Sequence, residues 1–137
     1  MRILAIDWGE KRVGLSVSDP LGILVTPLPY IENKGKKQVI EKLKEIIEEN
    51  DIDTIVMGIP KNIKGEFGER GEVYKKIGEE IEKKTRVKVE FFDERYTSRL
   101  AERILREHPK KKIKRKKLRD SLSASIILEG YLASIKK

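Results

Sequence analysis

The stretch ILAIDWGEKRVG, residues 3–14, opens the chain with an apolar strand that runs directly into a carboxylate. Residues 3–6 are apolar on both faces, which is typical of a central strand of a sheet. An ionised carboxylate that leaves water is costly unless it is paired or coordinates a metal. Asp7 therefore either begins a turn or lies beside something cationic at the end of this strand.

The residues that follow predict a hairpin and a third strand. Val13, Leu15 and Val17 alternate with small residues, as in a half-buried strand. The turn before them, in which Gly9 is available for a positive φ, makes this strand the hairpin partner of the first. After a second turn, ILVTPLPYI (residues 23–31) predicts a third strand, and its two prolines indicate a sheet edge.

Helices and strands alternate in the rest of the chain. Apolar spacing predicts a helix over 36–50, a strand over 54–60, a helix around 73–81, a strand over 87–92, a helix after Thr97 or Ser98, and a last helix over 118–135. Crossover helices imply that the first, fourth and fifth strands are parallel. We therefore expect an α/β protein with a mixed five-stranded sheet flanked by helices, in a single domain spanning residues 1–137.

Composition excludes several classes of protein. The chain has no Cys, so neither a disulfide framework nor a thiolate metal site is available, and His108 is its one histidine. A hydrophobic fraction of 38% contains no apolar run near the roughly 18 residues of a membrane helix. No signal peptide is recognisable. We expect a cytoplasmic protein without membrane contact.

The positive charge of the chain is concentrated in one segment. Residues 106–119, REHPKKKIKRKKLR, hold nine Lys or Arg and one Glu, which equals the whole net charge of +8. Clustered cations of this kind bind nucleic-acid phosphates, and we expect Lys111, Lys114, Arg115 and Lys117 to do so. The alternative is a solvated linker. The segment contains no aromatic residue, so base stacking is not indicated there.

Three polar segments follow the three strands that we expect to be parallel. Asp7, the loop that begins GIPKN at residue 58, and DER (residues 93–95) all fall at predicted carboxyl ends. Ligands of open α/β sheets bind beyond these ends. The coincidence favours one site over three unrelated turns.

Four stretches are similar, in order and spacing, to those of a known family. They are LAIDWGEKRVGLSVSD (4–19), GIPKNIKGEFGER (58–70), FFDERYTSRLAE (91–102) and DSLSASIILEGYL (120–132). Over essentially its whole length the chain resembles the YqgF family of Holliday-junction-resolvase-like proteins. The resemblance implies a ribonuclease H-like fold and a nuclease that processes the 5′ end of pre-16S rRNA in ribosome biogenesis. Loop 61–71 departs from the usual family pattern, which leaves its role open.

Phosphodiester hydrolysis needs an activated water and a stabilised leaving oxygen, and Mg²⁺ or Mn²⁺ held by carboxylates can supply both. Asp7 is the first candidate, against the alternative of a turn-forming Asp. DER supplies the second, where the sequence alone leaves Asp93 and Glu94 open and the resemblance points to Glu94. Asp120, expected beside Ser123 on a stripe that packs on the sheet, is the third, against the alternative of a helix N-cap.

Several further residues are candidates for contact with nucleic acid. The cations predicted to steer the phosphate backbone toward the carboxylates are Lys11, Arg12, Arg70 and Arg95. Trp8 is expected to pack in the core, with stacking on a base as the alternative.

Two other classes of function stay open at this stage. A nucleotide-binding domain of the actin and sugar-kinase class also has an Asp-x-Gly hairpin, but it needs two such domains and this chain has room for one. A nonenzymatic RNA-binding or ribosome-assembly protein would keep the basic segment without catalysis. Among nuclease substrates, charge alone does not distinguish structured or precursor rRNA from branched DNA, and RNA is favoured through the resemblance. The oligomeric state is not indicated.

Overall fold

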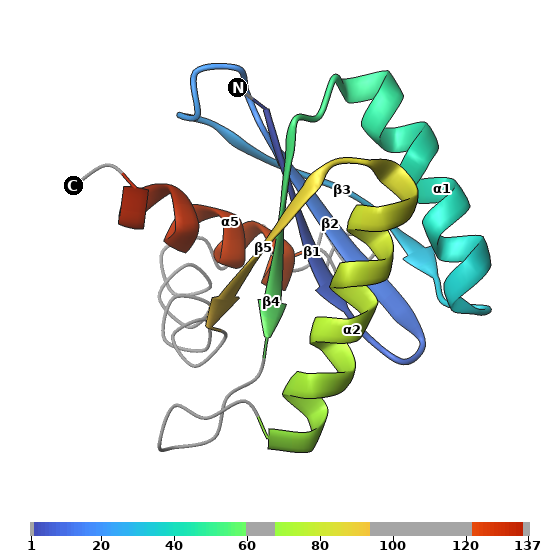
Figure 1. Cartoon of the computed structure of the whole chain (residues 1–137). Coiled ribbons are helices and arrows are strands. Elements are labelled where there is room, and N and C mark those ends of the chain that lie inside the picture. The colour runs from blue at the N-terminus through green and yellow to red at the C-terminus, as the bar shows by residue number, and fades with distance from the viewer. Residues whose placement is uncertain (1, 60–67, 94–121, 136–137) are drawn as a thin grey trace, which may run out of the picture.

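The structure is a computed structural model that describes residues 2–59, 68–93 and 122–135 (Figure 1). For residues 68–70 it describes the backbone alone. In chain order the elements are β1 (Ile3–Trp8), β2 (Arg12–Ser18), β3 (Val25–Glu32), α1 (Lys36–Asn50), β4 (Thr54–Ile59), α2 (Gly68–Thr85), β5 (Lys88–Asp93) and α5 (Leu122–Ile135). Every predicted strand is present. The helix expected after Thr97 or Ser98 lies outside the described residues.

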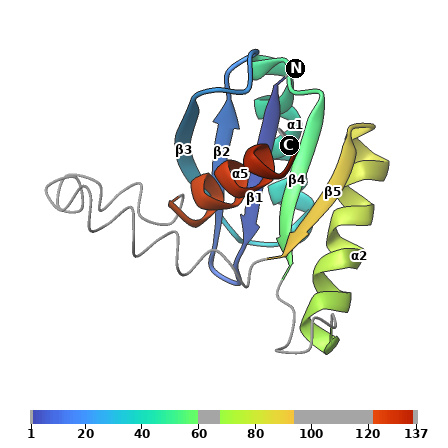
Figure 2. The same ribbon diagram turned by 90° about the vertical axis from the view of Figure 1, so that its left-hand side faces the viewer.

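The five strands form one mixed sheet in the order β3-β2-β1-β4-β5. β2 is antiparallel to both of its neighbours, whereas β1, β4 and β5 are parallel. The predicted hairpin, the edge position of β3 and the parallel direction of the other three strands are all confirmed. As a result, the carboxyl ends of β1, β4 and β5 lie together at one end of the sheet (Figures 1 and 2).

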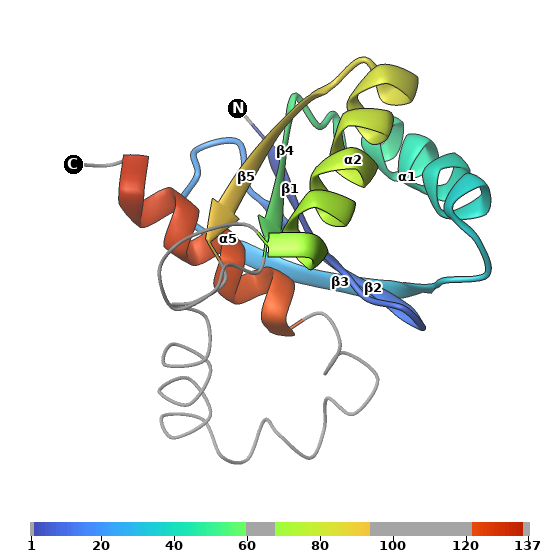
Figure 3. The same ribbon diagram turned by 60° about the horizontal axis from the view of Figure 1, so that its bottom comes forward.

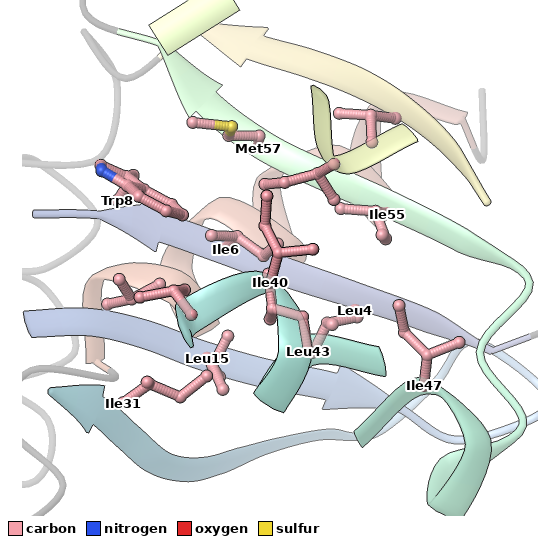
Figure 4. Close-up of a cluster of buried hydrophobic side chains, with 14 of the residues drawn as sticks. Leu4, Ile6, Trp8, Leu15, Ile31, Ile40, Leu43, Ile47, Ile55 and Met57 are labelled. Atoms are coloured by element: carbon pink, nitrogen blue, oxygen red, sulfur yellow. The ribbon is translucent and has the colours of Figure 1, made fainter. Parts of the chain in front are cut away.

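Helices cover both faces of the sheet, with α1 and α2 on one face and α5 on the other (Figure 3). Alternation along β1 divides its side chains between two cores. Leu4, Ile6 and Trp8 pack with α1 and α2, as the close-up in Figure 4 shows for α1, whereas Ile3 and Ala5 pack with α5. Complete burial of an aliphatic side chain the size of Leu4 or Ile6 contributes about 1.5–3 kcal/mol to the free energy of folding.

The helix α5 is buried over most of its first half. Ala124 and Ile127 belong to the predicted sheet-facing stripe and are fully buried, which confirms that part of the prediction. Ser123 was predicted on the same stripe but is exposed. Ser125, which was not on that stripe, is buried, and its hydroxyl donates a hydrogen bond to Ser16 Oγ at 3.0 Å. This bond fixes the start of α5 over β2.

The turn between β1 and β2 contradicts one prediction. Gly9 does not take a positive φ; among the described glycines, Gly22 and Gly35 do. A Cβ atom at Gly9 would lie 2.5 Å from the carbonyl oxygen of Arg12. Glycine is required at this turn because the carbonyl group of Arg12 passes too close to leave room for a Cβ atom. A positive φ is not the reason.

Candidate active site

Asp7 lies near the carboxyl end of β1 on the face of the sheet that α5 covers. Ala5, two residues earlier, packs in the α5 core, whereas Ile6 and Trp8 pack on the other side. Alternation therefore directs Asp7 toward the α5 face. Its side chain is partly buried, which is the setting in which a carboxylate needs a cation or donors.

Glycines flank Asp7 on both neighbouring strands. Gly14 of β2 is its antiparallel partner. On β4, Met57 is level with Ile6, so Gly58 is the next residue along and lies level with Asp7. Both glycines are buried. Neither neighbouring strand therefore places a side chain directly beside the carboxylate, at the usual strand spacing of about 4.8 Å.

The same alternation distinguishes between the two acids of DER. Val89 and Phe91 pack in the core formed with α1 and α2, and Asp93 continues that set. Phe92 packs instead against the α5 core. Asp93 therefore belongs to the face opposite Asp7, which favours Glu94, the residue chosen from the resemblance.

Most of the other predicted site residues lie outside the described residues. These are Glu94, Arg95, Lys111, Lys114, Arg115, Lys117 and Asp120; Arg70 is in α2, but its side chain is not described. Within the described ranges, no group of three His, Cys, Asp or Glu side chains forms a metal-binding cluster. Of the three carboxylates predicted to hold the metal, Asp7 is the one within the described residues, and it offers the oxygen ligands that Mg²⁺ and Mn²⁺ prefer.

Glu90 also faces α5, but it is occupied by other partners. The hydroxyl of Tyr131 on α5 donates a short hydrogen bond to Glu90, and Lys88 Nζ lies 3.3 Å from the same carboxylate. Burial, together with Glu90 as hydrogen-bond partner and negative charge, raises the pKa of Tyr131 to about 12. Glu90 therefore attaches α5 to β5. Residue patterns did not predict this contact, because it joins two elements about 40 residues apart.

The predicted cations of the first hairpin are held in place by the residue after β3. Asn33 donates its side-chain amide to the carbonyl of Gly9 and its backbone N–H to the carbonyl of Lys11, both at 2.8 Å. Lys11 and Arg12 are exposed at the same end of the sheet as Asp7. The hairpin therefore presents two positive charges near this carboxylate from a tethered backbone.

Aromatic residues near the site differ from the sequence-based expectation in one respect. Trp8 is 8% exposed and packs in the α1 and α2 core, which confirms its packing role and excludes it from stacking on a base. Tyr30 of β3 is only partly buried, and the guanidinium carbon of Arg12 lies 5.4 Å from its ring centroid. This is within the range of a cation–π contact. Tyr30 was not predicted as a site residue.

A groove of about 570 Å³ runs along the edge strand β3, between it and α1. Its lining includes Tyr30 and Glu32 of β3 and Gln38 and Lys42 of α1. The mixed charges of these residues do not resemble a carboxylate site. Across the part of the chain that the structure describes, no helix is long and apolar enough to cross a membrane.

Comparisons with known proteins agree with this geometry. A family model described as "RuvX: Holliday junction resolvase" matches residues 1–134. The chain is 40% identical over 137 residues, the whole of both chains, to the "Putative pre-16S rRNA nuclease" of Clostridium botulinum strain Eklund 17B. It is 43% identical over 134 residues to the protein of that name from Dictyoglomus thermophilum, with 98% of this chain and 96% of the relative covered.

Solved structures share the fold at low identity. The chain matches Thermus thermophilus RuvC in complex with a Holliday junction substrate with a TM-score of 0.59 and 11% identity, covering 100% of this chain and 97% of the other. It matches the fowlpox virus Holliday junction resolvase with a TM-score of 0.61 and 13% identity, and the match covers 98% of this chain and 99% of the resolvase. These neighbours and the mixed five-stranded sheet confirm the predicted ribonuclease H-like fold.

Proposed function

Because this chain belongs to the RuvX (YqgF) family of Holliday junction resolvases, we propose that it hydrolyses phosphodiester bonds at the 5′ end of pre-16S rRNA with a divalent metal ion. Family membership makes the chain a nuclease and confirms that prediction. The choice of RNA is supported by the names of relatives that are about 40% identical over nearly the full length of the chain. We place this activity in the cytoplasm, in one domain spanning residues 1–137.

The observation that carries the proposal is the placement of Asp7. Its carboxylate is directed to the α5 face at the carboxyl end of a central parallel strand, and Gly14 and Gly58 flank it there. The two glycines leave space where other residues would place side chains. A partly buried acid with no strand side chain on either side is suited to hold a cation against a bound phosphate group.

We propose that Asp7, Glu94 and Asp120 together hold Mg²⁺ or Mn²⁺. By alternation, Glu94 continues the series Glu90 and Phe92, whose side chains contact α5. α5 begins at Leu122, two residues after Asp120, and this end of the helix points toward the end of the sheet at which β1 finishes (Figures 1 and 2). When bound, the ion would activate the attacking water and stabilise the leaving oxygen.

The cations of the chain then act on the phosphate backbone rather than on the reacting bond. Lys11 and Arg12 are presented by the tethered hairpin next to Asp7, and we assign them to phosphates close to the cleaved bond. We assign the same role to Arg70 and Arg95. The basic segment 106–119 supplies contacts that do not depend on base sequence.

A second substrate is favoured by one specific observation, the description of the matching family as Holliday junction resolvases. Four-way DNA would use the same carboxylates, because both substrates present phosphodiesters. A third candidate, an RNA-binding assembly protein without catalysis, would need the basic segment but no acid at position 7.

A direct comparison of substrates tests the proposal. The purified chain is incubated with an end-labelled RNA that contains the pre-16S 5′ region and, separately, with a synthetic four-way DNA junction, each with Mg²⁺, Mn²⁺ or EDTA. We expect cleavage of the RNA that requires the metal. Cleavage of the junction alone would overturn the choice of RNA, and binding of both without cleavage would overturn the enzymatic function.

A further inference from the structure

Tyr30 and Arg12 form an aromatic and cationic pair on the same face of the sheet as Asp7. Ile31 packs in the core formed with α1 and α2, so its neighbour Tyr30 is directed to the opposite, α5, face. Val13 packs in the same core, so Arg12 is likewise directed to the α5 face. The contact between guanidinium and ring, 5.4 Å to the centroid, is consistent with both assignments.

The pair is level with Asp7 across the sheet. Asp7 pairs with Gly14 on β2. Between Val13 and Leu15 the register of β2 with β3 shifts, because Val13 pairs with Ile31 and Leu15 pairs with Leu28. Gly14 therefore lies opposite two residues of β3, Pro29 and Tyr30, so that β3 has one extra residue at this point.

The path from the carboxylate to the ring is free of strand side chains. Asp7 and Tyr30 are on strands separated by β2 alone, a separation of about 10 Å at the usual strand spacing. The β2 residue between them is Gly14, which has no side chain. β3 is the edge strand of the sheet, so a polymer that leaves Asp7 in this direction reaches Tyr30 and then the sheet edge.

We propose that the ring of Tyr30, with the guanidinium of Arg12 on it, stacks on an unpaired base next to the bond that is cleaved at Asp7. Aromatic rings and guanidinium planes are the common stacking surfaces for single-stranded RNA. A base within a duplex is already stacked and does not expose its face. This inference rests on the proposed nuclease site and specifies its substrate as RNA that is single-stranded beside the cleaved bond.

Other features of the hairpin support a preformed surface. Asn33 ties the β1–β2 turn to the end of β3 through hydrogen bonds to the carbonyls of Gly9 and Lys11. Arg12 is the antiparallel register partner of Glu32, the residue before Asn33. Because both members of the pair are on paired strands with a tethered turn, little ordering is needed when a base binds.

The test is a binding experiment in EDTA, so that the RNA stays intact whichever residues cleave it. The probes are RNAs of the pre-16S 5′ region with 2-aminopurine placed at successive positions along that region, around the bond that is proposed to be cleaved. We expect fluorescence quenching at one position close to that bond, on the side toward β3. Tyr30→Leu should remove this quenching and weaken binding about tenfold, whereas Tyr30→Phe, which keeps the ring, should retain both.

A complementary change in the RNA needs no variant protein. An abasic site at the quenched position, or a complementary strand that pairs it, should weaken binding of the unmodified chain by a similar factor. Quenching that persists in folded Tyr30→Leu, or equal affinity for the abasic RNA, would overturn the stacking role. Because these binding measurements do not require cleavage, they test the stacking role of Tyr30 even if the proposed nuclease function is wrong.

Discussion

The hydroxyl of Ser125 on α5 donates a hydrogen bond to the hydroxyl of Ser16 on β2, which in turn donates to the carbonyl of Thr26 on β3, each at 3.0 Å. Both serines are buried. This chain of bonds joins a helix to two strands on the face that carries Asp7. It therefore helps to fix the start of α5 relative to the candidate site.

Loss of this contact should destabilise the fold by a modest amount. Ser125→Ala leaves Ser16 without its donor and should lower the free energy of unfolding by about 1 kcal/mol, measured by urea denaturation. Ser123→Ala is the matched control, because Ser123 is exposed on the same helix and its replacement should change stability by less than about 0.5 kcal/mol. Equal effects of the two variants would contradict the role of the buried bond.

The contact between Tyr131 and Glu90 should make stability depend on alkaline pH. The folded-state pKa of Tyr131 is raised to about 12, above its value of about 10 in the unfolded chain. Its contribution is therefore fully present below pH 10 and is lost as the pH rises from about 10 through about 12. Tyr131→Phe should remove this part of the pH dependence, as judged by the difference between the two proteins in denaturation midpoints across that range. If the denaturation midpoints of the two proteins changed in parallel across this pH range, the role of the Tyr131–Glu90 contact would be contradicted.

Crowding at the first turn predicts an effect of Gly9→Ala. The added Cβ would meet the backbone oxygen of Arg12 at 2.5 Å, and no rotamer change can relieve a contact with backbone. The variant should lose about 1–3 kcal/mol of stability. It should also bind RNA more weakly, because Lys11 and Arg12 would be displaced. Urea denaturation and filter binding measure the two effects, and unchanged stability would show that the turn has more room than the structure indicates.

The fold was predictable because its strands and helices show either a clear period or, as in β1 and β4, a short continuous apolar run. Alternation identified β2, and the prolines of β3 identified the sheet edge, since each pattern reflects local burial. Gly9 shows the limit of this approach. A glycine in a turn can serve either to take a positive φ or to allow close backbone contact. Which of the two applies at Gly9 depends on the position of the Arg12 carbonyl group, which local sequence does not show.

The candidate site was predictable only in part, for a related reason. Asp7 could be identified because a carboxylate after a buried strand needs an explanation. Tyr30 could not be assigned, because its face depends on the register shift opposite Gly14, which has no signature in residue types. Ser125 was missed because the first half of α5 is buried on several sides, so a single stripe does not describe it.

The basic segment predicts a change in salt dependence. Replacing Lys111, Lys114, Arg115 and Lys117 with Gln should reduce the slope of log affinity against log salt concentration by up to about four and weaken binding to all sequences alike. The control replaces Lys37, Lys42, Lys76 and Lys83, four exposed lysines on α1 and α2, which cover the other face of the sheet. This removes the same charge and should leave the slope nearly unchanged. A slope unaffected by the first set would identify the segment as a solvated linker.

The central claim, that Asp7 holds the catalytic metal ion, is tested most directly by Asp7→Asn in a metal-dependent cleavage assay on the pre-16S RNA. Asp51→Asn is the control, because Asp51 is an exposed residue in the left-handed region, which Asn tolerates, just after α1. We predict that Asp7→Asn abolishes cleavage with Mg²⁺ and Mn²⁺ while RNA binding and the unfolding transition remain, and that Asp51→Asn cleaves as the unmodified chain does. Cleavage by Asp7→Asn at the unmodified rate would contradict the account.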